Sequence, residues 1–129
     1  MAQSIQQKLK LKPNQTILQI NAPINFEESI SPLPEGISFH KKISNPSQIH
    51  WFVKSQGEIK KQVVEVIKQL AEGTVLWIYF PKGSSGIQTD LTRDLGWELV
   101  LNPSNNLSRL TLISFDETWS AFAFRKMKV

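Results

Sequence analysis

The stretch Thr74-Val-Leu-Trp-Ile-Tyr-Phe80 decides the fold class, because every residue after the threonine is apolar or aromatic. Such a run indicates a central strand that is covered on both faces. Upstream of it, Ile49-His-Trp-Phe-Val53 predicts a second buried strand. Between the two strands, apolar residues recur at helical spacing at Ile59, Val63, Val66, Ile67 and Leu70. A strand–helix–strand unit of this kind favours a parallel sheet with helices packed on its faces.

The intervening helix has clear signals at both ends. Ser55 and Glu58 stand three residues apart and predict a capping box, in which each side chain accepts from the other residue's backbone N–H. Gly73 suits the left-handed position beyond the end of the helix.

The flanking sequence extends the pattern on both sides. We predict strands at residues 16–21, 37–43, 110–115 and 120–125, a brief helix or turn at 25–30, and a second helix marked by Leu91, Leu95 and Leu99 with Thr89 or Asp90 as its cap. The last two strands are close enough to form an antiparallel hairpin. The prediction is therefore one α/β domain over residues 1–129. It would be a three-layer, Rossmann-like domain whose mostly parallel sheet of about six strands ends in that hairpin.

Composition narrows the function classes. The 129 residues carry a net charge of +4, 40% are hydrophobic, and no apolar run reaches the length of a membrane span. Cysteine is missing, and neither His40 nor His50 has a partner at ligand spacing, so we expect no metal site. The start of the chain lacks the apolar core of a signal peptide. Basic and acidic residues are mixed, which makes nucleic-acid binding less favoured; its candidate residues are Lys8, Lys10, Lys12, Arg125 and Lys126.

The site is predicted from the strand assignments. In an open parallel sheet, ligands bind beyond the carboxyl ends of the strands, near the point where strand order reverses. The predicted strands end at Asn21, at Lys54 and at Pro81-Lys82, while Asp116 to Thr118 connects the hairpin. We expect these polar segments to meet at one edge.

The segment 81–94 is the densest candidate. Gly83 and Gly86 let the backbone turn inward, and the polar residues expected to hold an anion here are Lys82, Ser84, Ser85, Thr89 and Arg93. The alternative is a capped helix start in which Asp90 and Asp94 pair with Arg93 or Lys82. The local sequence does not decide between an anion site and a capped helix start.

Asp116-Glu-Thr-Trp119 is the other candidate segment. Its adjacent carboxylates suit acid–base work, but turn formation with the indole covering the sheet end is the favoured interpretation. Among the tryptophans, Trp51 and Trp77 are expected in the core, whereas Trp97 and Trp119 are candidates for stacking on a ligand.

Two resemblances follow from these motifs. Leu9-Lys-Leu-Lys-Pro-Asn-Gln-Thr-Ile-Leu-Gln-Ile-Asn-Ala22 resembles the opening of class I methyltransferases, and Leu70-Ala-Glu-Gly-Thr-Val-Leu-Trp-Ile78 resembles their helix-to-strand step. This resemblance implies the class I methyltransferase fold, with one strand–helix unit missing from the first half of the chain. That family holds S-adenosylmethionine on a Gly-x-Gly turn and an acidic residue after the second strand. Here Asn21-Ala-Pro-Ile-Asn25 and Lys41-Lys42 stand instead, so we carry over no site residue and expect no cofactor.

The second resemblance is to a family of small bacterial proteins of unknown function. It implies a cytoplasmic bacterial protein. The residues that carry it are Asn21-Ala-Pro23, Leu33-Pro-Glu-Gly36, Trp77, Pro81-Lys82, Ser85-Gly86, Thr89-Asp-Leu-Thr-Arg-Asp94 and Asp116-Glu-Thr-Trp-Ser120.

The leading hypothesis is a non-catalytic domain that binds a small anionic ligand, or a protein partner, at the carboxyl edge of the sheet. Its candidate residues are Lys82, Ser84, Ser85, Thr89, Arg93, Asn21, Lys54, Asp116 and Trp119. One alternative is a transferase that uses a nucleotide-like cofactor in an atypical pose, with Asp90, Asp94 or Asp116 as base. The other is nucleic-acid binding.

Overall fold

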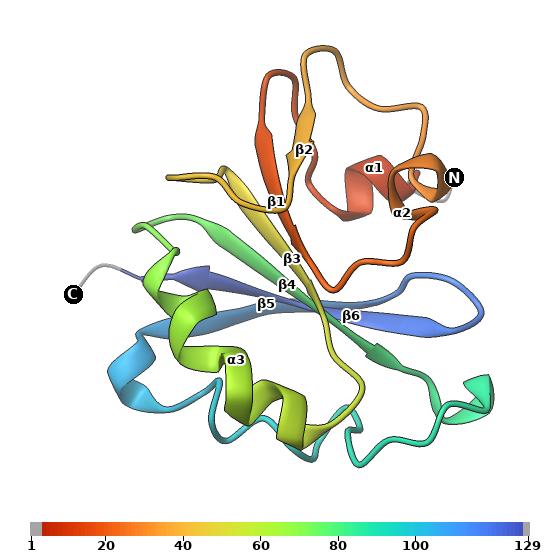
Figure 1. Ribbon diagram of the computed structural model, residues 1–129, viewed down its shortest axis with the longest axis vertical. Helices are drawn as coiled ribbons and strands as arrows, with labels where there is room; N and C mark the ends of the chain where they lie inside the picture. Colours follow the sequence, from red (N-terminus) through yellow and green to blue (C-terminus); the bar gives the residue numbers. More distant parts are fainter. Residues whose placement is uncertain (1–3, 128–129) are drawn as a thin grey trace.

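The computed structural model describes residues 4–127 and contains a six-stranded sheet in the order β2-β1-β3-β4-β6-β5 (Figure 1). The elements are α1 (Ile5–Lys8), β1 (Thr16–Ile20), α2 (Phe26–Ser29), β2 (Ser38–His40), β3 (Gln48–Phe52), α3 (Gln56–Lys68), β4 (Val75–Pro81), the 3₁₀ turns Gly83–Ser85 and Pro103–Asn105, β5 (Leu107–Ser114) and β6 (Trp119–Lys126).

Strand pairing confirms the predicted fold class. Strands β2, β1, β3 and β4 run parallel to one another, while β6 pairs antiparallel with both β4 and β5. All seven residues of β4 are buried, as expected of a central strand. Strand order reverses beside β1, because the chain passes from β1 to β2 on one side and then returns to β3 on the other. The sheet therefore has its switch point between β1 and β3.

The core lies on both faces of the sheet. On one face, α3 and the segment before β5 pack over Ile49, Trp51 and Ile78. On the other face, α1, α2 and their connections cover Trp77 and Tyr79. Figure 1 shows α3 on one side of the strands, with α1 and α2 grouped together near β1 and β2.

Helix α3 forms where it was predicted, with two differences in its caps. Ser55 is the N-cap, and its hydroxyl accepts from the Glu58 N–H at 3.2 Å. The reciprocal half of the capping box is wrong: the Glu58 carboxylate accepts from the N–H of Lys54, at 2.6 Å, rather than from that of Ser55. The helix ends at Lys68, and Gly73, with φ +85°, lies in the following turn, where its N–H donates to the Lys126 carbonyl.

The predicted second helix is wrong. Residues 86–102 contain no helix, and Leu95 and Leu99 are 60% and 44% exposed. Gly96 has φ +101°, which a right-handed helix does not allow. The N–H groups of Asp94 and Leu95 both donate to the Thr92 hydroxyl, so local side-chain bonds replace helical ones. The irregular segment nevertheless covers the sheet, because Leu91, Trp97 and Val100 are buried.

Smaller differences lie at the first strands. Strand β2 covers only Ser38–His40 of the predicted 37–43, and α1, capped by Ser4, was not predicted. The brief helix α2 falls inside the predicted 25–30. Within the described residues, no helix is both long and apolar enough to cross a bilayer.

Candidate functional site

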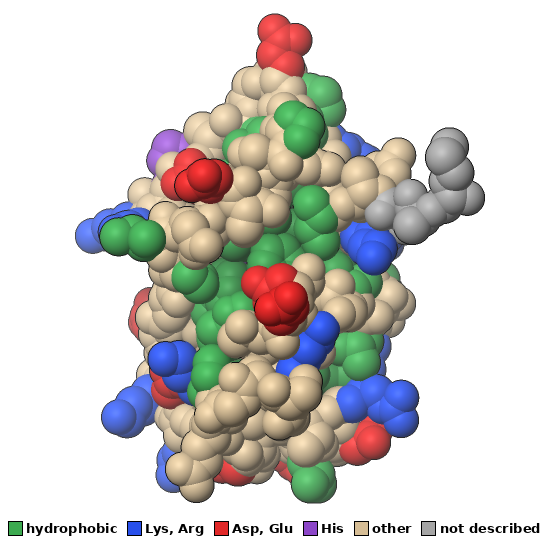
Figure 2. All heavy atoms as spheres, turned by 90° about the vertical axis from the view of Figure 1, so that its right-hand side faces the viewer, with side chains coloured by type: hydrophobic (Ala, Val, Ile, Leu, Met, Phe, Trp, Pro, Cys, Tyr) green, Lys and Arg blue, Asp and Glu red, His purple; other side chains and the backbone are tan. Residues whose placement is uncertain are grey.

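The predicted polar segments meet at the carboxyl edge of the sheet. Pro81 pairs with Trp119, and the Lys82 N–H donates to the Thr118 carbonyl at 2.8 Å, so the end of β4 is joined to the β5–β6 connection. Figure 2 shows the side of the molecule where this connection lies, with hydrophobic side chains gathered in the middle of the face among acidic and basic ones. More than one cavity opens at this edge. One of about 320 Å³ lies beside the ends of β1 and β2 and is lined by Gln19, Ile20, Asn21, Ala22 and Lys41. Two others each bring together predicted site residues from several segments.

The switch-point cavity has a volume of about 500 Å³ and lies beyond the ends of β1 and β3. It is lined by Asn21, Pro23, Phe52, Lys54, Glu58, Ile87, Thr118 and Trp119. The Trp119 ring packs edge-on against Phe52, with centroids 5.1 Å apart, and so closes the apolar floor. Three predicted site residues, Asn21, Lys54 and Trp119, are brought together here.

Asn21 fastens the wall of this cavity. It has left-handed backbone angles, φ 59°, directly after β1. Its side-chain amide donates to the Phe52 carbonyl at 3.1 Å and to Gln62 Oε1 at 2.8 Å. The end of β1 is thereby tied to β3 and α3. This side chain positions the cavity wall, and both of its amide N–H groups are already used.

The Lys82 cavity lies at the same edge but against the face that α3 covers. Its volume is about 320 Å³, and its lining residues are Phe80, Pro81, Lys82, Gly83, Thr89, Leu91, Thr92, Arg93, Leu112 and Ser120. Lys82, Thr89 and Arg93, all predicted, meet here. The Lys82–Thr118 backbone bond stands between the two cavities, since Thr118 lines one and Lys82 the other.

The lining of the Lys82 cavity is rich in donors. Lys82 and Arg93 supply two cations, and no lining residue carries a carboxylate. The hydroxyl oxygens of Thr89 and Thr92 accept backbone N–H groups, from Leu91 at 3.1 Å and from Asp94 at 3.2 Å. Their hydroxyl protons are thus left to donate. Arg93 pairs with Asp94 at 3.8 Å, but both side chains are more than 70% exposed, so this pair is weak.

Ser84, Ser85 and Asp116 line neither cavity. Ser84 and Ser85 form a 3₁₀ turn, and Ser85 Oγ accepts the Ile87 N–H at 3.1 Å. Asp116 Oδ1 accepts from the N–H groups of both Thr118 and Trp119 at 2.8 Å, which is the turn chemistry favoured for this segment. The expected helix start after Asp90 does not exist, so no helix dipole contributes to anion binding here.

Trp97 was wrongly expected to be available for stacking. It is 2% exposed, and its indole N–H donates to the Thr92 carbonyl at 2.6 Å. Trp51 and Trp77 are fully buried, as predicted. No three His, Cys, Asp or Glu side chains of residues 4–127 gather as metal ligands would.

A buried polar chain under β3 was missed by sequence reasoning. His50 Nδ1 lies 2.7 Å from the Tyr79 hydroxyl, and His50 Nε2 lies 2.8 Å from Gln48 Oε1. The Gln48 amide donates to the carbonyls of Leu9 and Lys10, at 3.1 and 3.0 Å. Burial lowers the pKa of His50 to about 3, and burial followed by the charge of Asp116 raises the pKa of Tyr79. Because Gln48 and His50 are two residues apart, they share a sheet face, which is the only sequence signal of this contact.

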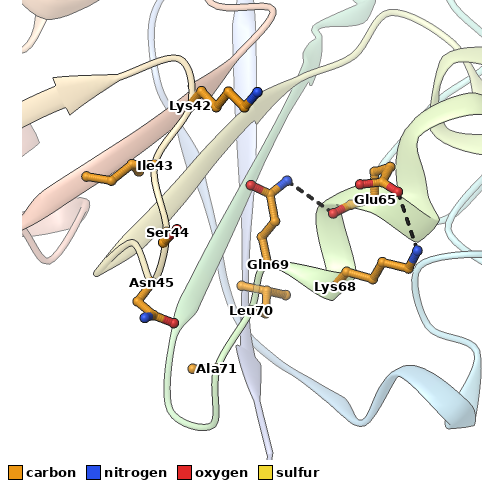
Figure 3. A pocket seen from close by; sticks show the side chains of 9 residues that line it. All are labelled: Lys42, Ile43, Ser44, Asn45, Glu65, Lys68, Gln69, Leu70 and Ala71. Carbon is orange, nitrogen blue, oxygen red and sulfur yellow. Dashed lines mark hydrogen bonds and ion pairs between the residues drawn. The ribbon is translucent and has the colours of Figure 1, made fainter.

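A larger hollow of about 610 Å³ lies elsewhere, between the β2–β3 connection and the end of α3 (Figure 3). None of the predicted site residues lines it. In Figure 3, Lys68 pairs with Glu65 at 3.4 Å and the Gln69 side chain donates to the Glu65 carbonyl, while Lys42 lies apart on the β2–β3 connection. It occupies the place where a crossover helix between β2 and β3 would lie, so we treat it as a consequence of the short connection.

Comparison with known proteins supports the fold. No protein-family model and no curated protein matches this chain. Among solved structures, a Streptococcus thermophilus rRNA methylase is similar with a TM-score of 0.60 and 9% identity, covering 99% of both chains. The fibrillarin pre-rRNA processing protein of Methanococcus jannaschii is similar with a TM-score of 0.58 and 12% identity, and the match covers 99% of this chain and 71% of that one. A Streptococcus agalactiae protein of the NADB-Rossmann superfamily is similar with a TM-score of 0.54 and 6% identity, and the match covers 100% of this chain and 70% of that one. The fold is therefore Rossmann-like and methyltransferase-like.

Proposed function

We propose that this protein binds a small organic anion in the Lys82 cavity without transforming it. The observation that carries the proposal is the donor-rich lining: two cations and two threonine hydroxyls, with no lining carboxylate. Lys82 gives one of its three N–H groups to the Ser114 hydroxyl and keeps the others. Phe80, Leu91 and Leu112 add an apolar wall, so the ligand would carry a short apolar part. A volume of about 320 Å³ limits it to a small molecule.

The acids favour binding over catalysis. Asp90 Oδ1 accepts the Gln56 N–H at 2.8 Å, Asp94 pairs with Arg93, and Asp116 holds the hairpin turn. Asp90 and Asp116 therefore already have structural partners, and the exposed Asp94 lines neither the switch-point cavity nor the Lys82 cavity. A general base must instead be placed against the reacting group.

The transferase alternative draws its support from the switch-point cavity and from the likeness to an rRNA methylase. Against it stand the turn Asn21-Ala-Pro23, which has no glycine, and the two lysines, Lys41 and Lys42, after β2. Calorimetry with S-adenosylmethionine and nucleotides separates the hypotheses, since only the transferase predicts binding of such a cofactor. A protein partner at this edge stays a prediction.

A thermal-shift screen of mono- and dicarboxylates and phosphomonoesters tests the binding proposal, because a ligand that prefers the folded state raises the melting temperature. We expect a hit whose shift is lost in Lys82→Ala/Arg93→Ala. The control is Lys60→Ala/Lys61→Ala, which removes two charges from the exposed side of α3. Retention of the full shift in the Lys82/Arg93 variant would overturn the proposal.

A further inference from the structure

A separate cavity, at the opposite edge of the sheet, concentrates positive charge. This amino-edge cavity has a volume of about 510 Å³ and is lined by Gln7, Lys10, Leu11, Lys12, Gln15, Ser47, Gln48, Gly73, Val75 and Arg125. Gln48 and Val75 begin β3 and β4, and Arg125 pairs with Val75 from the end of β6. It is therefore separated from the carboxyl-edge cavities by the length of the strands.

Its three cations come from the two ends of the chain. Lys10 and Lys12 precede β1, whereas Arg125 lies near the end of β6. None of its lining residues is acidic. Across residues 4–127, the ion pairs are Lys68–Glu65 and Arg93–Asp94, so these three side chains are not neutralised by a neighbouring carboxylate. All three side chains are exposed, so their mutual repulsion is modest, and an anion bound between them would offset it.

The buried polar chain fixes this cavity from below. Gln48 lines the cavity and is 2% exposed. Its side-chain amide donates to the carbonyls of Leu9 and Lys10. His50 and Tyr79 complete the chain behind it. Lys10 is held at φ 60°, a left-handed conformation that is unusual for lysine. Lys10 takes this conformation as the residue that terminates α1: its N–H donates to the Gln7 carbonyl, and the N–H of Leu11 donates to the Gln6 carbonyl, both at 3.0 Å.

We infer that the amino-edge cavity binds the phosphate groups of a small, multiply charged phosphorylated molecule. Two amide side chains, Gln7 and Gln15, and the Ser47 hydroxyl line the cavity beside the cations. Lysine, arginine and neutral donors together suit phosphate oxygens. The cations surround a hollow instead of forming a stripe, which favours a compact polyanion over a nucleic-acid strand. Lys126, which was also a candidate for nucleic-acid binding, does not line this cavity and donates to the Asn105 carbonyl at 2.7 Å.

Tripolyphosphate is a suitable probe, titrated into the full-length protein at fixed ionic strength and followed by calorimetry and by amide chemical shifts. We expect one-to-one binding, with the largest shifts at Lys12, Gly73 and Arg125. Lys12→Gln/Arg125→Gln should weaken binding by at least about tenfold, because each hydrogen bond to a charged group is worth roughly that factor. Lys10→Asn tests the third cation while keeping a residue that tolerates left-handed angles.

Matched controls make the result decisive. Lys60→Gln/Lys61→Gln removes the same charge from α3 and should leave tripolyphosphate binding unchanged. The melting temperature of each variant without ligand shows that it is folded. An equal loss of binding in the α3 variant, or chemical shifts confined to the carboxyl edge, would overturn the inference. Tighter binding of single-stranded RNA than of tripolyphosphate would likewise overturn it, since that result assigns the cations to a nucleic-acid surface.

Discussion

The Nδ1 atom of His50 lies 2.7 Å from the Tyr79 hydroxyl oxygen in the centre of the sheet. The hydrogen-bond chain determines which ring nitrogen of His50 carries the proton. Gln48 uses its amide N–H groups on two backbone carbonyls, so its Oε1 must accept from His50 Nε2. Nδ1 is then free to accept from the Tyr79 hydroxyl. The fold thus holds a neutral imidazole with both ring nitrogens satisfied, and this has a consequence for acid stability.

Stability should fall toward acid pH because of His50. Burial lowers the pKa of His50 to about 3, while the unfolded chain has its ordinary value near 6.5. Above pH 6.5 the imidazole is neutral in both states. Below it, only the unfolded state takes up the proton, so the free energy of unfolding decreases by about 1.4 kcal/mol per pH unit down to about pH 3. Urea denaturation between pH 7.5 and 5 measures this slope.

His50→Gln should remove most of that dependence, although it also lowers the stability at neutral pH. His40→Gln is the matched control, because His40 is only partly buried and bonds to Ser38. An unchanged slope in His50→Gln would show that other groups cause the acid sensitivity.

Asn21→Ala should destabilise the fold and loosen the switch-point cavity. Alanine loses both amide hydrogen bonds and resists the left-handed φ of 59°, so we expect a loss of about 2 kcal/mol. Asn21→Gly keeps the backbone freedom and loses only the bonds, and its cost should be smaller. Urea denaturation of both variants gives the comparison, and equal costs would mean that the backbone angle contributes nothing.

Gly96→Ala should be among the more damaging small substitutions. An added Cβ would lie 2.5 Å from Leu91 Cδ2 and 3.0 Å from Gln56 Cγ, at a φ of +101°. We expect a loss of about 2 kcal/mol or more in thermal or chemical unfolding. Gly83→Ala is the control, since nothing lies within 4 Å of its Cβ position. If Gly96→Ala proved as mild as Gly83→Ala, the backbone of residues 87–101 would have to follow a different path from the one described.

Asp116→Ala should weaken the β5–β6 turn. One carboxylate oxygen accepts from two backbone N–H groups, so alanine leaves both without that acceptor and should cost about 1–2 kcal/mol. Asp116→Asn keeps an oxygen in place and should restore most of the loss. Hydrogen exchange at Thr118 and Trp119 reports the turn directly, and unchanged protection in Asp116→Ala would contradict this role.

The succession of strands along the chain and the position of the main helix were determined by the sequence itself. The unbroken apolar run of β4, the helical spacing from Ile59 to Leu70 and the Ser55 cap are local signals, and local periodicity reports which faces are buried. The same signals placed Lys82, Thr89 and Arg93 at the carboxyl edge, because strand direction fixes where each strand ends.

Only the tertiary structure decided the path of residues 87–101 and the division of the site. The spacing of Leu91, Leu95 and Leu99 is that of a helix, yet a left-handed Gly96 and a buried Trp97 gave more stable packing. The end of β4 then separated two cavities that the sequence suggested as one. The amino-edge cavity depends on Lys10 and Arg125, from opposite ends of the chain, meeting across the sheet. Contacts between residues so far apart leave no periodic trace in the sequence, because they arise from the packing of finished elements.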